Sequence, residues 1–352
     1  MHRLLLSTAV VLLFSAQYAA AQTAFKMETT DRQQVNATIT YEIKMRSFAV
    51  TQWMIFLPEP PELPSQKNVK TKATPGGKVL SEKSLLERKV RYIELPVANP
   101  KRGTGVSMTL DISATLRTRN LVPLKAGEKP PVVAPLTANE QKYYLSSTEH
   151  VDFDAKAFQG WLDAKKLRLE KNEDPLEFAV RILEVIRADY TYNYAAEEDK
   201  RASVTCRGTK TDCAGMSYLF VGAMRANNIP ARLLVGRQAY PRKSGSNPAQ
   251  TDYDRPHIRV EMFLTGIGWV PVEPAYSHHW KSRPVSTYIG HDPGDMIVLH
   301  VDVDLKLPFP DKVRNSQFIQ ISPHYWTWGH GEFDGYFGPS GWDVRTTPMR
   351  ER

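Results

Sequence analysis

Two stretches in the second half of the chain decide its fold: residues 212–236, DCAGMSYLFVGAMRANNIPARLLVG, and residues 256–276, PHIRVEMFLTGIGWVPVEPAY. The first predicts a helix that begins at Cys213, because its apolar residues recur at helical spacing, and Pro230 ends the pattern. The residues after it predict β-strands at 231–235, 257–264 and 269–272. A helix followed by an antiparallel sheet is typical of an α+β domain.

Cys213 opens the predicted helix, directly after Thr211 and Asp212, either of which could cap it. A thiol attacks as the thiolate, and the positive end of a helix dipole and a neighbouring imidazolium both stabilise that anion. Backbone N–H groups of the first turn also point to where an oxyanion would develop. The alternative is a buried structural cysteine, since free cysteine is among the most buried residue types.

Four elements in these stretches, taken in order, are more specific than a single cysteine motif. A cysteine opens a helix, the helix exit reads RANNIPAR, a histidine opens a strand, and GWVPVEP carries an acidic residue. Over residues 174–276 the chain thereby resembles the transglutaminase-like superfamily. The resemblance implies a papain-like α+β domain with Cys213 as nucleophile, His257 as base and Glu273 as the acid that orients the imidazole. It also implies attack on an amide or peptide carbonyl through a thioester that water or an amine resolves.

The predicted strands give His257 and Glu273 a feasible geometry. His257 opens one strand and Glu273 closes the next, so a hairpin around Gly266 and Gly268 would bring both side chains to one face of the sheet. Glu273 departs from the aspartate that most members of the superfamily carry, and it is longer by one methylene. Two alternatives stay open. The third role is weak or the site inactive, and without Cys213 the better interpretation of His257 is a surface histidine or a satisfied core histidine.

The chain has two cysteines, so it is not a disulfide-stapled scaffold. Cys206 is near enough in sequence to form a disulfide with Cys213 in an oxidising compartment, and that bond would silence the nucleophile. We expect free thiols in preference. No oxyanion partner beyond the Cys213 backbone is identifiable, and Tyr190 and Tyr192 are candidates only.

The first half of the chain predicts an antiparallel β-sandwich domain, residues 22–135. Residues 35–45, VNATITYEIKM, alternate apolar and polar side chains in the manner of a half-buried strand. Further β-rich runs occupy 52–57, 89–96 and 107–118. The proline-rich segment 123–135 favours an extended linker, so the transglutaminase-like catalytic domain is placed at 136–295. Within it, Asp174 and Pro175 begin a helix that runs to about Ala188.

Residues 296–352 predict a C-terminal extension of strands and loops packed on the catalytic domain. Its aromatic stretch, 324–342, either lines a substrate groove or packs on itself. The polar loop 237–256 is a candidate lid. No histidine spacing supports a metal site, and no acidic cluster resembles a calcium loop, so we expect no metal, no cofactor and no calcium dependence. The histidines considered for that role are His278, His279, His291 and His300.

The first residues resemble an export signal. His2 and Arg3 precede an apolar run at 4–16, and Ala19 and Ala21 offer a cleavage site. We expect a signal peptide at 1–21 and a periplasmic or extracellular protein, with an uncleaved membrane anchor as the alternative. No later stretch is long and apolar enough to span a bilayer.

The formal net charge of +8 is spread along the chain without a dense basic block. This argues against nucleic-acid binding and suits weak attraction to a cell-envelope polymer. The sequence therefore predicts an exported cysteine-nucleophile enzyme, a protease, amidase or transglutaminase-type acyltransferase, whose substrate is a protein or peptide. The rival hypotheses are a noncatalytic binding module of the cell envelope and a sandwich that determines function by docking a partner.

Overall fold

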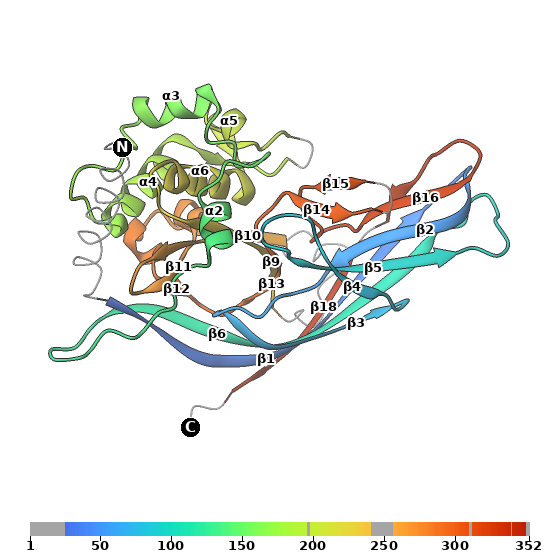
Figure 1. Ribbon diagram of the computed structural model, residues 1–352, viewed down its shortest axis with the longest axis horizontal. Coiled ribbons are helices and arrows are strands. Elements are labelled where there is room, and N and C mark those ends of the chain that lie inside the picture. Colours follow the sequence, from blue (N-terminus) through green and yellow to red (C-terminus); the bar gives the residue numbers. More distant parts are fainter. Residues whose placement is uncertain (1–24, 196–197, 241–255, 310–311, 339, 350–352) are drawn as a thin grey trace, which may run out of the picture. The chain divides into compact units, whose positions relative to one another are not determined.

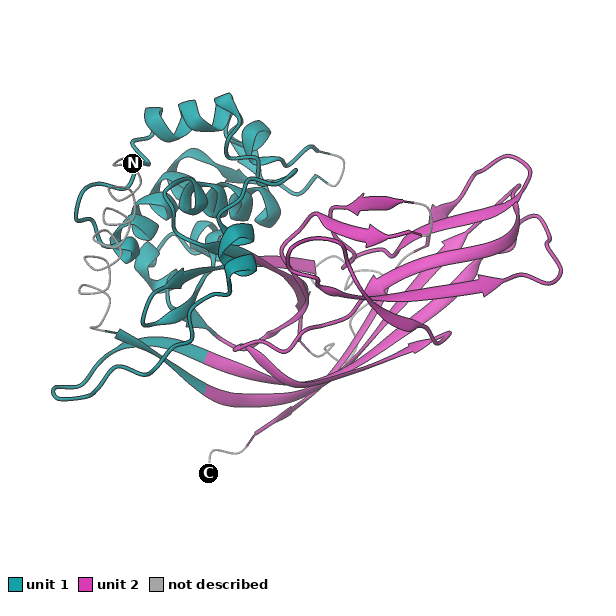
Figure 2. Cartoon of the chain, in the orientation of Figure 1, with its two compact units in different colours: residues 1–29, 119–232, 259–292 teal, residues 30–118, 233–258, 293–352 magenta. Residues whose placement is uncertain are grey.

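The computed structural model describes residues 25–195, 198–240, 256–309, 312–338 and 340–349. The predicted signal peptide, 1–21, and most of the candidate lid, 237–256, lie outside these residues. The chain divides into two compact units (Figure 2). Unit 1 combines residues 119–232 and 259–292 with the chain before Thr30, and unit 2 combines 30–118, 233–258 and 293–352.

Unit 2 is built from antiparallel strands (Figure 1). One sheet contains β1 (Phe25–Lys44), β3 (Gln66–Thr74), β6 (Val106–Pro123), β17 (Tyr336–Phe337) and β18 (Gly341–Pro348). A second sheet has the order β16 (His324–His330), β2 (Ala49–Pro58), β5 (Lys89–Pro96) and β4 (Lys78–Ser81). β9 (Ala231–Gln238) pairs with β13 (Met296–Val301), and β14 (Leu305–Pro308) pairs with β15 (Val313–Ser316).

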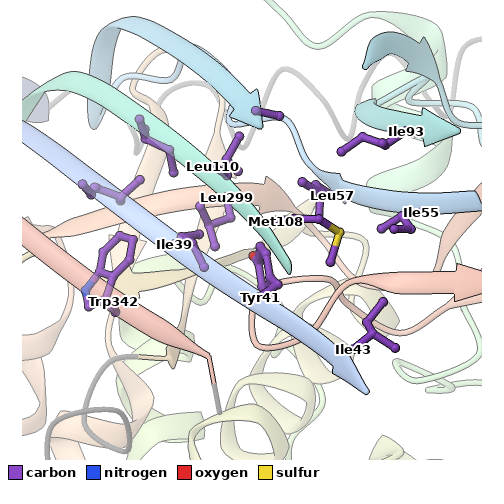
Figure 3. Packing of buried hydrophobic residues seen from close by; sticks show 14 of the residues in the cluster. Ile39, Tyr41, Ile43, Ile55, Leu57, Ile93, Met108, Leu110, Leu299 and Trp342 are labelled. Carbon is purple, nitrogen blue, oxygen red and sulfur yellow. The ribbon is translucent and has the colours of Figure 1, made fainter. Parts of the chain in front are cut away.

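The main core of unit 2 follows from strand alternation. In β1 every second residue from Val35 to Ile43 is buried, and β2 directs Trp53, Ile55 and Leu57 into the same core. Figure 3 shows Ile39 and Tyr41 of β1 and Leu57 of β2 in this core, together with Met108 and Leu110 of β6 and Trp342 of β18. The opposite face of β2 carries Met54 and Phe56 into a second cluster with Leu305 and Leu307. The predicted fold class, antiparallel N-terminal sheets followed by an α+β domain, is confirmed.

The C-terminal strands differ from the expected extension on the catalytic domain. β16 pairs with β2, and β18 pairs with β1 in a register that sets Trp342 opposite Ile39. Both strands therefore belong to unit 2, and the two units do not coincide with the contiguous divisions 22–135, 136–295 and 296–352. The physical reason is that a β-strand can be paired by residues about 300 positions away, and local sequence pattern does not name the partner.

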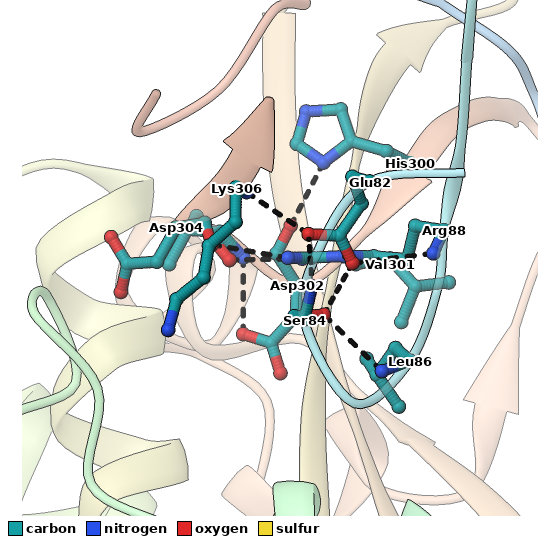
Figure 4. Close-up of polar contacts among 10 residues, drawn as sticks. Glu82, Ser84, Leu86, Arg88, His300, Val301, Asp302, Asp304 and Lys306 are labelled. Atoms are coloured by element: carbon teal, nitrogen blue, oxygen red, sulfur yellow. Dashed lines mark hydrogen bonds and ion pairs between the residues drawn. The ribbon is translucent and has the colours of Figure 1, made fainter. Parts of the chain in front are cut away.

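A buried polar network closes the turn between β13 and β14 (Figure 4). The Arg88 guanidinium donates to Glu82 at 3.1 Å and to the carbonyls of Val301 and Val303 at 2.9 Å. His300 lies in the same region, with its Nδ1 2.8 Å from the Asp302 carbonyl oxygen. Burial lowers the pKa of His300 to about 3, so this histidine is a neutral core residue.

Unit 1 holds the helices. They are α2 (Ala138–Tyr144), α3 (Lys156–Ala164), α4 (Pro175–Asp189), α5 (Ala202–Thr205), α6 (Cys213–Ala226), α8 (Pro274–His279) and the 3₁₀ turn η2 (Val285–Tyr288). Its short strands are β7 (Thr191–Tyr192), β8 (Lys210–Thr211) and β12 (His291–Asp292), beside the hairpin of β10 (Pro256–Leu264) and β11 (Gly268–Val272). The first three residues of β10 fall in unit 2. In the described part of the chain, no helix is long and apolar enough to cross a membrane.

Helix α6 is the centre of unit 1, because all its residues from Ala214 to Arg225 are buried. Helices α4, α5 and α8 pack against it. Helix α3 comes so close that a Cβ added at Gly222 would lie 2.8 Å from the Phe158 ring. The predicted helix starts are confirmed: Asp174 caps α4, with Pro175 in its first turn, and Asp212 caps α6.

Candidate active site

Cys213 is the first residue of α6, and Asp212 holds the start of that helix. Asp212 Oδ1 accepts from the backbone N–H groups of Ala214 at 2.9 Å and Gly215 at 3.3 Å. Burial raises the pKa of Asp212, while Lys200, whose Nζ lies 3.3 Å from Oδ2, and the two N–H groups act in the opposite direction. Cys213 itself is a free, partly exposed thiol. The thiol thus lies at the positive end of a buried helix dipole.

The glycine of the DCAG sequence is required by close packing at the same helix start. A Cβ built on Gly215 would lie 1.9 Å from Thr211 Oγ1. Thr211 is itself fixed, because it pairs with Tyr192 between β7 and β8, and its carbonyl accepts from Asn193 N–H at 2.8 Å. Only glycine lets the helix begin this close to β8.

The RANNIPAR sequence, at the end of α6, holds the chain in place where it leaves the helix. The Arg225 guanidinium donates from Nε to the Ala231 carbonyl at 2.9 Å and from Nη1 to the Ser146 carbonyl at 3.3 Å. Asn228 adopts the left-handed conformation, with φ of 59°, in the turn that follows α6. The motif therefore fixes how the chain leaves the Cys213 helix and enters β9.

His257 is the second residue of β10 and is buried. The β10/β11 register pairs Val260 with Val272 and Leu264 with Gly268, and the turn contains two glycines with positive φ, Gly266 and Gly268. The predicted hairpin is therefore present. Side chains two residues apart on a strand point to the same face, so His257, Arg259 and Glu261 share one face of β10.

Glu273 directly follows β11, and its backbone N–H donates to the Tyr288 carbonyl at 2.9 Å. Its Oε2 accepts from Arg259 Nε at 2.7 Å, and Arg259 Nη1 donates to Asp292 Oδ1 at 3.1 Å. None of these three side chains is more than 8% exposed. The sequence interpretation missed Arg259 and Asp292. Arg259 could have been noticed as an arginine in the alternating pattern of a buried strand. Asp292 lies too far along the chain for the pattern of that strand to indicate it.

Glu261 is the centre of a second buried ion cluster. It accepts from Arg232 Nε at 2.7 Å and forms an ion pair with Arg119, whose guanidinium also donates to the Trp269 carbonyl. The Arg232 guanidinium lies 3.9 Å from the centre of the Trp269 ring. Burial would raise the pKa of Glu261, but Arg232 and Arg119 together hold it below the ordinary value. This cluster anchors the middle of β10.

Cys206 lies at the end of α5 and is free and buried, so the structure contains no bond between the two cysteines. Its S–H group donates to the Ser203 carbonyl at 3.4 Å. Burial raises the pKa of Cys206 to about 11, and Asp152 adds to that effect while Arg207 opposes it. Cys206 is therefore a poor nucleophile.

The remaining polar candidates have other partners. His278 Nε2 accepts from Tyr192 N–H at 3.3 Å, and His291 Nδ1 lies 2.7 Å from Asn120 Oδ1. Tyr190 is buried, and burial raises the pKa of its phenol. Within the described ranges, no group of three or more His, Cys, Asp or Glu side chains could hold a metal ion.

A family model described as the transglutaminase-like superfamily matches residues 164–274. The match spans α4, α6 and the β10/β11 hairpin, and it includes Cys213, His257 and Glu273. The chain contains a transglutaminase-like domain. This domain is less than a third of the sequence, and the sheets of unit 2 lie almost wholly outside it.

One solved structure agrees with this chain in its fold. A crystal structure from Cytophaga hutchinsonii, named only provisionally as a cysteine protease, matches with a TM-score of 0.57 and 11% identity, over 93% of this chain and 96% of its own. The periplasmic domain of TgpA from Pseudomonas aeruginosa matches with a TM-score of 0.35 and 13% identity, over 78% of this chain and 95% of that one. No curated protein sequence matches the chain. At 11% identity, the likeness to the Cytophaga hutchinsonii structure concerns the fold alone and not the activity.

Proposed function

We propose that this chain is an exported cysteine-nucleophile enzyme that attacks amide or peptide carbonyls through Cys213, His257 and Glu273. One observation carries the proposal: inside a transglutaminase-like domain, Cys213 is a free, partly exposed thiol at the first residue of an otherwise buried helix. That position favours the thiolate, which is the form of cysteine that attacks.

Each of the three side chains has a defined role in the proposed reaction. His257 takes the thiol proton, and the Cys213 thiolate bonds to the carbonyl carbon. The backbone N–H of Cys213 stabilises the oxyanion, because those of Ala214 and Gly215 already donate to Asp212. The imidazolium then gives its proton to the leaving amine as the C–N bond breaks, leaving a thioester on Cys213. Water or an amine resolves the thioester, which makes the product a carboxylate or a new amide.

Glu273 supports this assignment as the acid that orients the His257 ring. Its carboxylate is buried, and a buried carboxylate stays ionised only beside positive charge or hydrogen-bond donors. The Arg259 guanidinium, 2.7 Å from Oε2, supplies both. An ionised, immobile carboxylate is what the third position of such a triad requires.

Export is part of the proposal and rests on the sequence at 2–21, where a basic start precedes an apolar run and small residues. A protein or peptide substrate follows from the reaction class. The formal charge of +8 would keep the enzyme near anionic envelope polymers.

The test is the pH dependence of Cys213 alkylation by iodoacetamide in reduced protein, read by mass spectrometry. We expect fast alkylation near pH 6 that falls roughly ten- to hundredfold in His257→Ala, because an unpaired thiol of pKa about 8.5 is almost wholly protonated there. His278→Ala is the matched control, since His278 is another buried histidine with a backbone hydrogen bond. Cys206 in the same protein is the internal standard for an unreactive thiol.

A Cys213 that titrates as an ordinary thiol, with equal rates in wild type and His257→Ala, would refute the enzyme. The noncatalytic binding module would then be the better hypothesis.

A further inference from the structure

One face of β10 carries two buried ion clusters, side by side in sequence. Arg259 lies between the carboxylates of Glu273 and Asp292, and Glu261 lies between the guanidiniums of Arg119 and Arg232. The first cluster has one cation and two anions, and the second has two cations and one anion, so the six formal charges cancel. Such an arrangement is costly to bury and needs a reason.

We propose that Arg259 is a positioning residue for Glu273, and that Asp292 in turn fixes Arg259. The inference rests on the proposed function, because positioning matters only if Glu273 orients the catalytic imidazole. Neither residue touches the reacting atoms in this scheme. Their role is to give the Glu273 carboxylate one charge state and one orientation.

The geometry supports a fixed orientation. The β10/β11 register ends at the pair Val260 and Val272, and Arg259 and Glu273 are the next residues of the two segments. The Arg259 side chain reaches sideways to Glu273 through Nε and onward to Asp292 through Nη1. A planar guanidinium held at both edges cannot rotate without breaking one contact.

The far end of this chain of contacts is fixed as well. Asp292 lies in β12, which pairs with β6 at Arg119, and Gly290 N–H donates to the Pro271 carbonyl at 2.7 Å. The backbone of Glu273 is held by the Tyr288 carbonyl. Backbone contacts therefore hold Glu273 and Asp292 in place independently of the contacts that their side chains make.

The charge state follows from the same contacts. Two carboxylates that share a buried site without a cation repel each other, and one of them takes up a proton. Arg259 between them removes that repulsion. Glutamate has one more rotatable bond than aspartate. A site with glutamate as its third residue therefore gains more from an arginine that fixes the carboxylate.

The test uses Arg259→Met, which keeps an unbranched side chain about as long as the arginine stem but removes the guanidinium with its charge and donors. We expect iodoacetamide alkylation of Cys213 at pH 6 to fall at least tenfold, and the pH profile to move toward that of an ordinary thiol. Arg259→Lys should recover part of the rate, because it restores charge without the planar fork. Asp292→Asn, a nearly isosteric change, should lower the rate two- to fivefold.

Glu261→Gln is the matched control, because it breaks the neighbouring buried cluster on the same strand. Urea unfolding of every variant shows that the compared proteins are folded. An unchanged pH profile in folded Arg259→Met, or an equal change in Glu261→Gln, would overturn the positioning role and leave the proposed function intact. If wild-type Cys213 lacks the His257-dependent reactivity at pH 6, the proposed function fails, and the positioning role fails with it.

Discussion

The surroundings of the two cysteines differ in almost every respect, although the residues lie seven positions apart in the transglutaminase-like domain. Cys213 begins the 14-residue helix α6 and is partly exposed. Cys206 follows the four-residue helix α5 and is buried, and that burial raises its pKa to about 11. The thiol is thus partly exposed at the start of a helix in one position and buried in the other. Position in the fold, and not residue type, makes the difference.

The largest expected effect separates the two cysteines directly. Cys213→Ser should reduce any thiol-dependent amide or peptide cleavage by about a thousandfold or more, because serine in a site built for a thiolate is a far weaker nucleophile. Cys206→Ser should leave the rate within about twofold. A peptide library digested with each purified variant and read by mass spectrometry measures both. An equal loss of cleavage rate in the two variants would show that both substitutions act by disturbing the fold, and not that Cys213 is the nucleophile.

A second prediction sharpens the role of the helix start. Gly215→Ala should lower the free energy of unfolding by about 1–3 kcal/mol, because the new Cβ overlaps Thr211 Oγ1 and a packed site yields poorly. Removing the obstacle in Gly215→Ala/Thr211→Ala should recover part of the loss. Urea midpoints of the two single variants and the double variant give the coupling between the sites. Additive effects on stability would mean that the two sites are not coupled and that the new Cβ is not in conflict with the Thr211 side chain.

The smallest expected effect concerns pH and Cys206. A raised folded pKa means that the unfolded chain loses this proton first, so the native state binds more protons between about pH 9 and 11. Wild-type stability should therefore fall with rising pH in that window, at a rate of about 1 kcal/mol per pH unit from this group. Cys206→Ala should lose this part of the pH dependence of stability. Below pH 8, Cys206 should contribute no pH dependence in the wild type either. Urea unfolding at several pH values measures the difference.

Much of the candidate site could be predicted from sequence because its signals are local. The cap at Asp212, the apolar stripe of α6 and the glycines of the β10/β11 turn are each encoded within a few residues. The order of these elements was specific enough to indicate the superfamily, and the family match at 164–274 confirms it. The catalytic roles of Cys213, His257 and Glu273 stay a prediction.

The rest could not be read from the sequence because it depends on distant residues. Asp292 reaches Arg259 from 33 positions along the chain, and Arg119 reaches Glu261 from 142 positions. Strand β3 carries three lysines in its nine residues, and β4 has only four residues, so neither showed the alternation that identified β1. The C-terminal strands had a recognisable pattern, but nothing local tells a strand which edge it completes.

The pairing of β18 with β1 has a consequence for how the protein is made. Gln33 to Thr40 are synthesised some 300 residues before their partners, Gly341 to Pro348. Throughout that interval the β1 edge facing β18 is unsatisfied, and the indole of Trp342 is missing from the core that Figure 3 shows. Unit 2 therefore cannot close vectorially as it is synthesised. Its folding is deferred until β18 has been synthesised, and a chain interrupted before β18 would expose an unpaired, aggregation-prone strand edge.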